Sequence, residues 1–116
     1  MIVLAGIKNC NTVRSARRWL DDNNIEFDFL DLRSDQFNKI TLGMWLENVE
    51  WTTLLNKRST SWRGLEDKDR DGLDEARAMK IMLQHPALIK RPVLMLGDSI
   101  ELGFSAERYV QLFKSS

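Results

Sequence analysis

The stretch IVLAGIKNCNTVRSARRWLDD, residues 2–22, decides the fold. Its first part, IVLAGI, is short, apolar and partly β-branched, which predicts a buried strand. From Asn11 or Thr12 onward the apolar residues recur at helical spacing, and both of these residue types favour a helix N-cap. The single cysteine of the chain, Cys10, therefore lies between a predicted strand and a predicted helix.

The rest of the chain completes an α/β pattern. The stretch IEFDFLDL, 25–32, alternates apolar and acidic residues and predicts a half-buried strand, parallel to the first because a helix connects them. Helices are predicted within 37–49 and over 73–84, around a polar, turn-rich 58–74. The end predicts strands at 93–96 and 100–103, joined as an antiparallel hairpin, and a last helix after Ser105. This order, β-α-β, helices, β-β-α, predicts one four-stranded mixed sheet with an inserted helical subdomain.

Composition sets limits on function. Of the 116 residues, 17 are basic and 17 acidic, so the formal net charge is zero, whereas general nucleic-acid or anionic-membrane binders carry a basic excess. One cysteine cannot form an internal disulfide, which favours a reducing compartment. The sequence shows no signal peptide and no run of about 20 apolar residues. We therefore expect a cytoplasmic protein that binds neither nucleic acid nor membrane.

Cys10 is the main candidate for chemistry. The unpaired N–H groups and the dipole of a helix N-terminus favour an anion, and a thiolate is one. Lys8 and Arg14 would add positive potential. The simpler interpretation is a small buried hydrophobe, as most unpaired cysteines are. Val13 occupies the last position of a C-x-x-C pair, so a nucleophilic Cys10 would need an external thiol for its release.

Two basic features are candidate anion sites. The first is KRPV, 90–93, in which Pro92 opens an apolar strand, its preceding bond could be cis, and Arg91 could hold an anion near the thiol. Spacing alone favours a plain loop arginine and a strand-starting proline. The second is NKRSTSWR, 56–63, where Arg58 belongs to a basic cluster that could bind an anion, although the sequence alone favours a simply solvated cluster. No His, Cys or Asp cluster has metal-binding spacing, so we expect no metal site and no bound cofactor.

The motifs together resemble a known family. K-x-C-x-T-x-x-x-A from Lys8 to Ala16, L-N-K-R near residue 55, and K-R-P-V-L at 90–94 followed by G-F are similar to the ArsC-like family, over nearly the whole chain. That family holds glutaredoxin-coupled arsenate reductases, Spx-type transcriptional regulators and a YffB-type group, which this chain resembles most. The resemblance implies a thioredoxin-like core at about 1–35 and 88–116, a helical insertion at about 36–87, and a cis Pro92 beside the active cysteine.

The resemblance carries over unevenly to single residues. It implies that Cys10 is catalytic, and that Thr12 and Arg14 match the start of the reductase helix. Arg91 matches an oxyanion-binding arginine. Arg58 is displaced from the reductase L-L-R position, Phe104 replaces a late arginine, and Gly6 replaces a histidine. Each lost charge weakens an oxyanion site, since a charge-assisted hydrogen bond contributes about 1.5–3 kcal/mol.

The functional expectation is a monomeric, glutathione-dependent thiol oxidoreductase acting on a small oxidised or anionic substrate. Cys10 would be the nucleophile, with glutathione as co-substrate and glutaredoxin as a further partner. The residues expected to bind substrate or anion are Lys8, Asn11, Thr12, Arg14, Arg58, Arg91 and Pro92. Two alternatives stay open: a glutaredoxin-coupled arsenate reductase, and a non-enzymatic Spx-like regulator that binds RNA polymerase.

Overall fold

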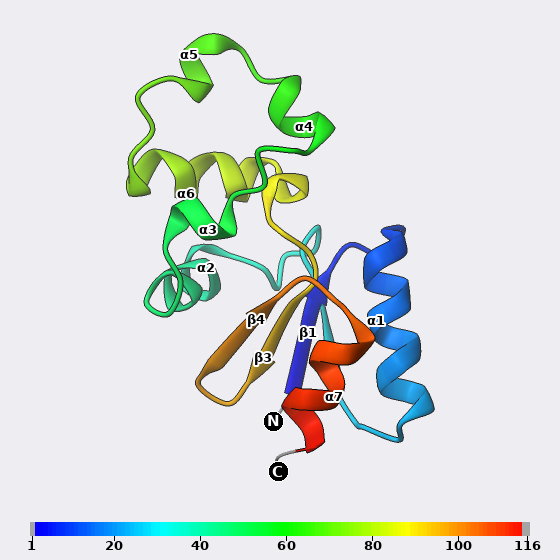
Figure 1. The fold of residues 1–116 in the computed structure, drawn as a ribbon. Helices are drawn as coiled ribbons and strands as arrows, with labels where there is room; N and C mark the ends of the chain where they lie inside the picture. Colours follow the sequence, from blue (N-terminus) through cyan, green and yellow to red (C-terminus); the bar gives the residue numbers. More distant parts are fainter. Residues whose placement is uncertain (1, 115–116) are drawn as a thin grey trace. The chain divides into compact units, whose positions relative to one another are not determined.

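The computed structural model describes residues 2–114 of the chain (Figure 1). The chain divides into two compact units. The sheet unit comprises Met1–Leu32 and Arg91–Ser116, and the helical unit comprises Arg33–Lys90. The insertion that the sequence predicts at about 36–87 falls inside the helical unit.

The sheet unit is a four-stranded mixed sheet with two helices. Its elements are β1 (Ile2–Gly6), α1 (Asn11–Asp22), β2 (Asp28–Asp31), β3 (Val93–Leu96), β4 (Ser99–Leu102) and α7 (Ala106–Lys114). The strand order is β2-β1-β3-β4. Strand β1 pairs in parallel with β2 and antiparallel with β3, and β3 and β4 form an antiparallel hairpin. The predicted α/β fold, with its parallel pair and its closing hairpin, is confirmed.

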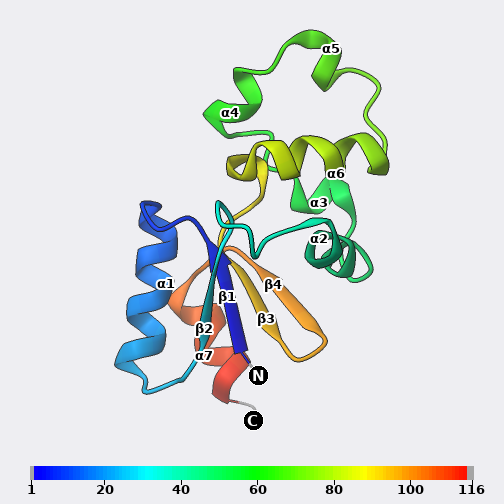
Figure 2. The ribbon, with the colours of Figure 1, turned by 180° about the vertical axis from the view of Figure 1, so that it is seen from behind.

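One face of this sheet carries the core that fixes both helices. Leu4 and Leu94 from the two central strands pack with Ala16 and Leu20 of α1 and with Tyr109 of α7, and all five are fully buried. Figure 1 shows α7 in front of the sheet, and Figure 2, which views the chain from behind, shows α7 on the far side of the sheet. Both helices therefore cover the same face, and α1 is held along β1 by its small and apolar side.

The helical unit has its own core. Its elements are α2 (Lys39–Leu46), α3 (Trp51–Leu54), α4 (Thr60–Arg63), α5 (Asp67–Arg70), α6 (Glu75–Gln84) and the 3₁₀ turn η1 (Pro86–Leu88). The fully buried Trp45 stacks on Phe37 at 5.4 Å between ring centroids. An isolated antiparallel bridge joins Leu55, which follows α3, to Ile89, which follows η1.

Three local predictions were wrong in detail. The N-cap of α1 is Cys10, because Asn11 and Thr12 are already helical and the Arg14 N–H donates to the Cys10 carbonyl. Strand β2 begins only at Asp28, which pairs with Val3, so the residues before it have almost no β1 left to pair with. The turn-rich 58–74 contains α4 and α5, and single turns of four residues are too short to show a helical period.

Tyr109 provides a test of the core. Its ring is fully buried among aromatic neighbours, but its hydroxyl has no hydrogen-bond partner among the described residues. A buried hydroxyl without a partner costs about 1–3 kcal/mol. We therefore expect Tyr109→Phe to leave the free energy of unfolding unchanged or to raise it by about 1 kcal/mol. Urea unfolding followed by circular dichroism measures the change.

Alkaline unfolding checks the same hydroxyl. Burial, together with the Glu101 carboxylate, raises the pKa of Tyr109. The folded protein therefore keeps this proton at a pH where the unfolded chain, with a tyrosine pKa of about 10, loses it. The tyrosine's contribution to stability is complete below pH 10 and is lost as the pH rises toward the folded pKa. In Tyr109→Phe the free energy of unfolding should therefore decrease less steeply above pH 10 than in the wild type. A Tyr109→Phe variant that is less stable than the wild type at pH 7 would show instead that the hydroxyl has a hydrogen-bond partner.

Candidate active site

The only cysteine stands at the junction between β1 and α1. Strand β1 ends at Gly6, and the Cys10 N–H donates to the Ile7 carbonyl at 3.1 Å, which turns the chain toward the helix. Cys10 is extended, with φ −92° and ψ 126°, as an N-cap residue is, and its side chain makes no capping hydrogen bond. The thiol is half-buried and unpaired. It is therefore neither a core residue nor a disulfide partner within the chain.

The first turn of α1 is suited to an anion. No acidic residue occurs in this turn, and no side chain caps its N–H groups. These groups and the helix dipole supply a positive partial charge at the position of the Cys10 side chain. The junction can thus present a nucleophilic sulfur.

Strand pairing brings a second segment to this end of the sheet. Ala5 pairs with Val93 in the antiparallel β1–β3 ladder, so the residues just before β3 lie beside those just after Ala5. These residues are Arg91 and the buried Pro92, and the bond between them is cis, as the family resemblance implied. The Gly103 N–H donates to the Pro92 carbonyl at 2.9 Å and links this turn to the end of β4.

Arg91 is a cation available to a ligand. It is half-buried, and within residues 2–114 its guanidinium makes no hydrogen bond or ion pair. A half-buried guanidinium without a partner loses hydration for no internal gain. An anionic ligand would supply the missing partner.

The other predicted site residues fall into two groups. Lys8, Asn11, Thr12 and Arg14 are exposed around Cys10, and Arg14 donates to the Asn11 side-chain carbonyl at 3.2 Å. Arg58 belongs to the helical unit, where its own N–H donates to the Asn56 side chain and its carbonyl accepts from Arg63. The structure thus gathers the first group at the cysteine, while Arg58 is described only within its own unit.

Gly6 is a residue whose importance the sequence analysis missed. A Cβ atom at this position would lie 2.6 Å from Cγ2 and 2.9 Å from Cγ1 of Val13, which is fully buried. Only a residue without a side chain lets the first turn of α1 approach β1 so closely. The signal was present in the sequence, because a glycine inside a strand pattern often marks a close backbone approach.

The sequence that forms this site matches a known protein family. The family model described as ArsC family matches residues 5–112. The chain belongs to the ArsC family. The match begins at Ala5, near the end of β1, and includes Cys10 and the Arg91–Pro92 turn, so the ArsC-type region contains the whole candidate site of the sheet unit.

Individual relatives cover almost the full chain. An uncharacterised protein of Haemophilus influenzae is 38% identical, over 97% of this chain and 99% of its own length. The global transcriptional regulator Spx 2 of Bacillus anthracis is 25% identical, over 92% of this chain and 82% of its own.

Solved structures agree with this assignment. The YFFB protein is 39% identical with a TM-score of 0.89, covering 96% of this chain and 97% of that one. An arsenate reductase (ArsC) related protein from Brucella melitensis is 37% identical with a TM-score of 0.78, covering 97% and 94%. The chain therefore has the fold of the arsenate reductase-like thiol oxidoreductases.

Two further properties concern the described residues. Within residues 2–114, no group of three or more His, Cys, Asp or Glu side chains is arranged to hold a metal ion. Among the same residues, no helix combines the length and the apolar character needed to cross a membrane.

The Gly6–Val13 contact gives a test of how the junction is built. In Gly6→Ala the new methyl meets a β-branched side chain that cannot swing away, so we expect a loss of about 1–3 kcal/mol in the free energy of unfolding. In Gly6→Ala/Val13→Ala the clash is gone, so the two substitutions should couple favourably by at least about 1 kcal/mol. Urea unfolding of the four chains of the cycle measures this.

A matched glycine provides the control. Gly43 lies inside α2, and the nearest atom to a Cβ there is the Met79 methyl at 4.0 Å. Gly43→Ala should be neutral or stabilising by about 0.5–1 kcal/mol, because alanine is the better helix residue. Equal losses at Gly6 and Gly43 would contradict the close approach.

Proposed function

We propose that the protein is a glutathione-dependent thiol oxidoreductase whose nucleophile is Cys10. The observation that carries the proposal is the position of the half-buried, unpaired thiol at the N-cap of α1, whose first turn holds no acidic residue. The unpartnered Arg91 at the same end of the sheet adds a cation for an anionic substrate. Membership of the ArsC family supports thiol chemistry at this cysteine.

The reaction would proceed by thiol–disulfide exchange. The Cys10 thiolate attacks one sulfur of a disulfide substrate, a mixed disulfide forms on Cys10, and the other sulfur leaves as a thiolate. A glutathione thiolate then attacks the substrate sulfur of this mixed disulfide and releases Cys10. A second glutathione reduces the resulting glutathione–substrate disulfide, so that two glutathiones become one glutathione disulfide while the substrate gains two electrons and two protons.

The release step needs a thiol from outside the chain. The position of a second cysteine in a C-x-x-C pair is filled by Val13, whose side chain is fully buried over Gly6. No internal thiol can therefore attack the mixed disulfide, and glutathione or a glutaredoxin would take this role. A cytoplasm that keeps glutathione reduced is the compartment in which this cycle can run.

The anion-binding role falls to residues around the cysteine. Glutathione carries two carboxylates, and the guanidinium of Arg91 can hold one in two parallel hydrogen bonds. Lys8, Asn11, Thr12 and Arg14 are exposed near the first turn of α1 and can contact the rest of the peptide. Pro92 is buried and would shape the turn that presents Arg91. Arg58 is proposed as a further anion ligand from the helical unit.

Two other functions have support from the relatives. Reduction of arsenate, with glutaredoxin as the coupled reductant, is suggested by the arsenate reductase related protein from Brucella melitensis. Regulation of transcription through RNA polymerase is suggested by the Spx relatives. The missing second cysteine argues against a dithiol switch in this chain, and the absent oxyanion-binding arginine at Phe104 argues against arsenate.

The central prediction concerns adduct formation. Incubation with glutathione disulfide should give one glutathione per chain on Cys10, and reduced glutathione should remove it. Cys10→Ser should give none. Intact-mass measurement followed by peptide mapping reads the result. No adduct, together with arsenate-dependent turnover in a glutaredoxin-coupled assay or with polymerase capture that Cys10→Ser leaves intact, would replace this proposal by one of the alternatives.

A second prediction concerns Arg91. Removal of one charge-assisted hydrogen bond to a carboxylate costs about 1.5–3 kcal/mol, so Arg91→Ala should slow adduct formation with glutathione disulfide by roughly 10- to 100-fold. Arg18→Ala is the matched control, because Arg18 is exposed on α1 well beyond its first turn. Samples that are quenched with an alkylating reagent at set times and analysed by mass spectrometry give the rates of adduct formation. Equal rates for the two variants would remove Arg91 from the site.

A further inference from the structure

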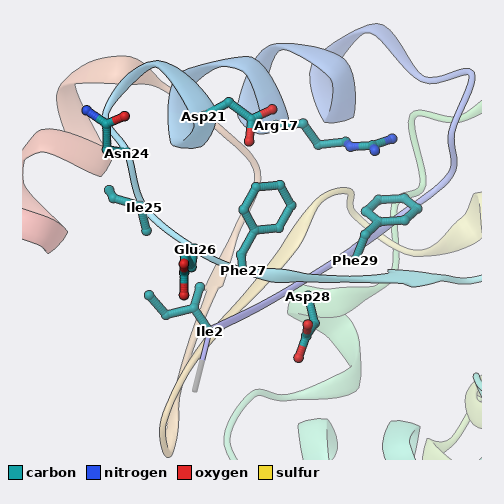
Figure 3. A pocket seen from close by; sticks show the side chains of 9 residues that line it. All are labelled: Ile2, Arg17, Asp21, Asn24, Ile25, Glu26, Phe27, Asp28 and Phe29. Carbon is teal, nitrogen blue, oxygen red and sulfur yellow. The ribbon is translucent and has the colours of Figure 1, made fainter.

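A groove of about 920 Å³ lies along the outer edge of the sheet unit, between β2 and α1 (Figure 3). Strand β2 is the terminal strand of the sheet, with β1 on one side and no strand of the described chain on the other. The groove therefore follows a sheet edge, whose backbone groups can accept a further strand.

The register shows which backbone groups face outward. In a parallel ladder, alternate residues of a strand direct their N–H and C=O groups to the same neighbour. The Leu32 N–H donates to the Gly6 carbonyl at 3.0 Å, on the β1 side. Phe29, an odd number of positions away, therefore directs its backbone N–H and C=O toward the open edge.

The aromatic and the acidic side chains at this edge lie on opposite faces of the strand. Figure 3 shows Phe27 and Phe29 pointing toward α1, while Asp28 points to the opposite side of the strand. The two rings are half-buried, and the Arg17 guanidinium lies 4.5 Å from the centroid of Phe29. A strand added here would meet apolar rings on one face and acidic groups on the other.

The charge of the groove is uncompensated. Asp21, Glu26 and Asp28 are exposed, and none of their carboxylates has an ion-pair partner within residues 2–114. Arg17 is the one cation among the lining residues, and it lies over an aromatic ring. The groove therefore favours a cationic occupant.

We propose that the open edge of β2 binds an extended basic segment of a partner protein as an added strand. Apolar residues of that segment would lie against Phe27 and Phe29, and the alternating lysines or arginines would face Glu26 and Asp28. A second copy of this chain is a poor occupant, because antiparallel pairing of two such edges brings the carboxylates of both copies together. The proposal is independent of the thiol chemistry at Cys10.

The test uses the full-length protein and two labelled peptides. One is the fluorescein-labelled peptide TKVKVKT, and the other is its acidic counterpart TEVEVET. Fluorescence anisotropy should show saturable binding of the basic peptide alone. Glu26→Lys/Asp28→Lys should weaken this binding by at least about tenfold and create binding of the acidic peptide. Glu47→Lys/Asp35→Lys makes the same change in net charge elsewhere and should alter neither.

The geometry of the added strand has its own test. In a strand paired at one edge, only alternate N–H groups of the peptide face the protein. Two variants of TKVKVKT test this, one with N-methyl groups on its lysines and one with N-methyl groups on its valines. One of these variants should lose binding, and the other should keep it. Amide resonances of residues 26–29 should shift on binding in a ¹H–¹⁵N spectrum.

The proposal is overturned by several results. Absence of saturable binding by TKVKVKT would overturn it. If Glu26→Lys/Asp28→Lys and Glu47→Lys/Asp35→Lys weakened binding equally, the binding would be a general charge effect and the proposal would also be overturned. Equal tolerance of both N-methylated peptides would exclude strand addition. A concentration-dependent dimer that Glu26→Lys/Asp28→Lys disrupts would assign the edge to a second copy. Glutathionylation of Cys10 should stay unchanged in the edge variant, which keeps this outcome separate from the catalytic proposal.

Discussion

The approach of α1 to β1 at Gly6 is the constraint on which the rest of the sheet unit depends. Val13 fills the space that a side chain at Gly6 would need, and this contact fixes the height of the first helical turn above the strand. Because Cys10 is the N-cap of that turn, the same contact fixes the thiol at the end of the sheet. Packing at the end of β1 thus decides where the sulfur of Cys10 lies.

The same contact limits the chemistry that the chain can perform. Val13 stands where a dithiol protein has its second cysteine, and it is committed to packing over a glycine. A single thiol can form a mixed disulfide but cannot resolve it, so the catalytic cycle that we propose depends on a second molecule. The packing of α1 on β1 and the proposed need for an external thiol therefore both depend on Val13.

Much of this architecture could be predicted from the sequence, because the strands and the longer helices carry clear periods. The alternation in residues 25–32 and the apolar run at 93–96 identified β2 and β3, and the short turn after Leu96 identified the hairpin. The helix cap was missed because Asn11 and Thr12 have better capping side chains than Cys10, although the backbone of Cys10 takes the cap geometry. Local propensity was overridden there by the packing of the helix on the strand.

The site itself was only partly accessible to sequence reasoning. Cys10 and its neighbours are local and could be grouped by spacing. The placement of Arg91 at the same end of the sheet depends on the β1–β3 register, which no local pattern encodes. The role of Gly6 and the acidic edge of β2 were both visible as residue types, but their meaning depends on distances and on which strand is outermost.

The antiparallel pairing of β1 with β3 has a consequence for synthesis of the chain. Cys10 leaves the ribosome before Arg91, which follows about 80 positions later, and contacts so distant in sequence are slow to form. A nascent chain therefore exposes its thiol before Arg91, which we propose as an anion ligand, has been made. The proposed anion site beside Cys10 is therefore complete only after the segment that contains Arg91 has been synthesised.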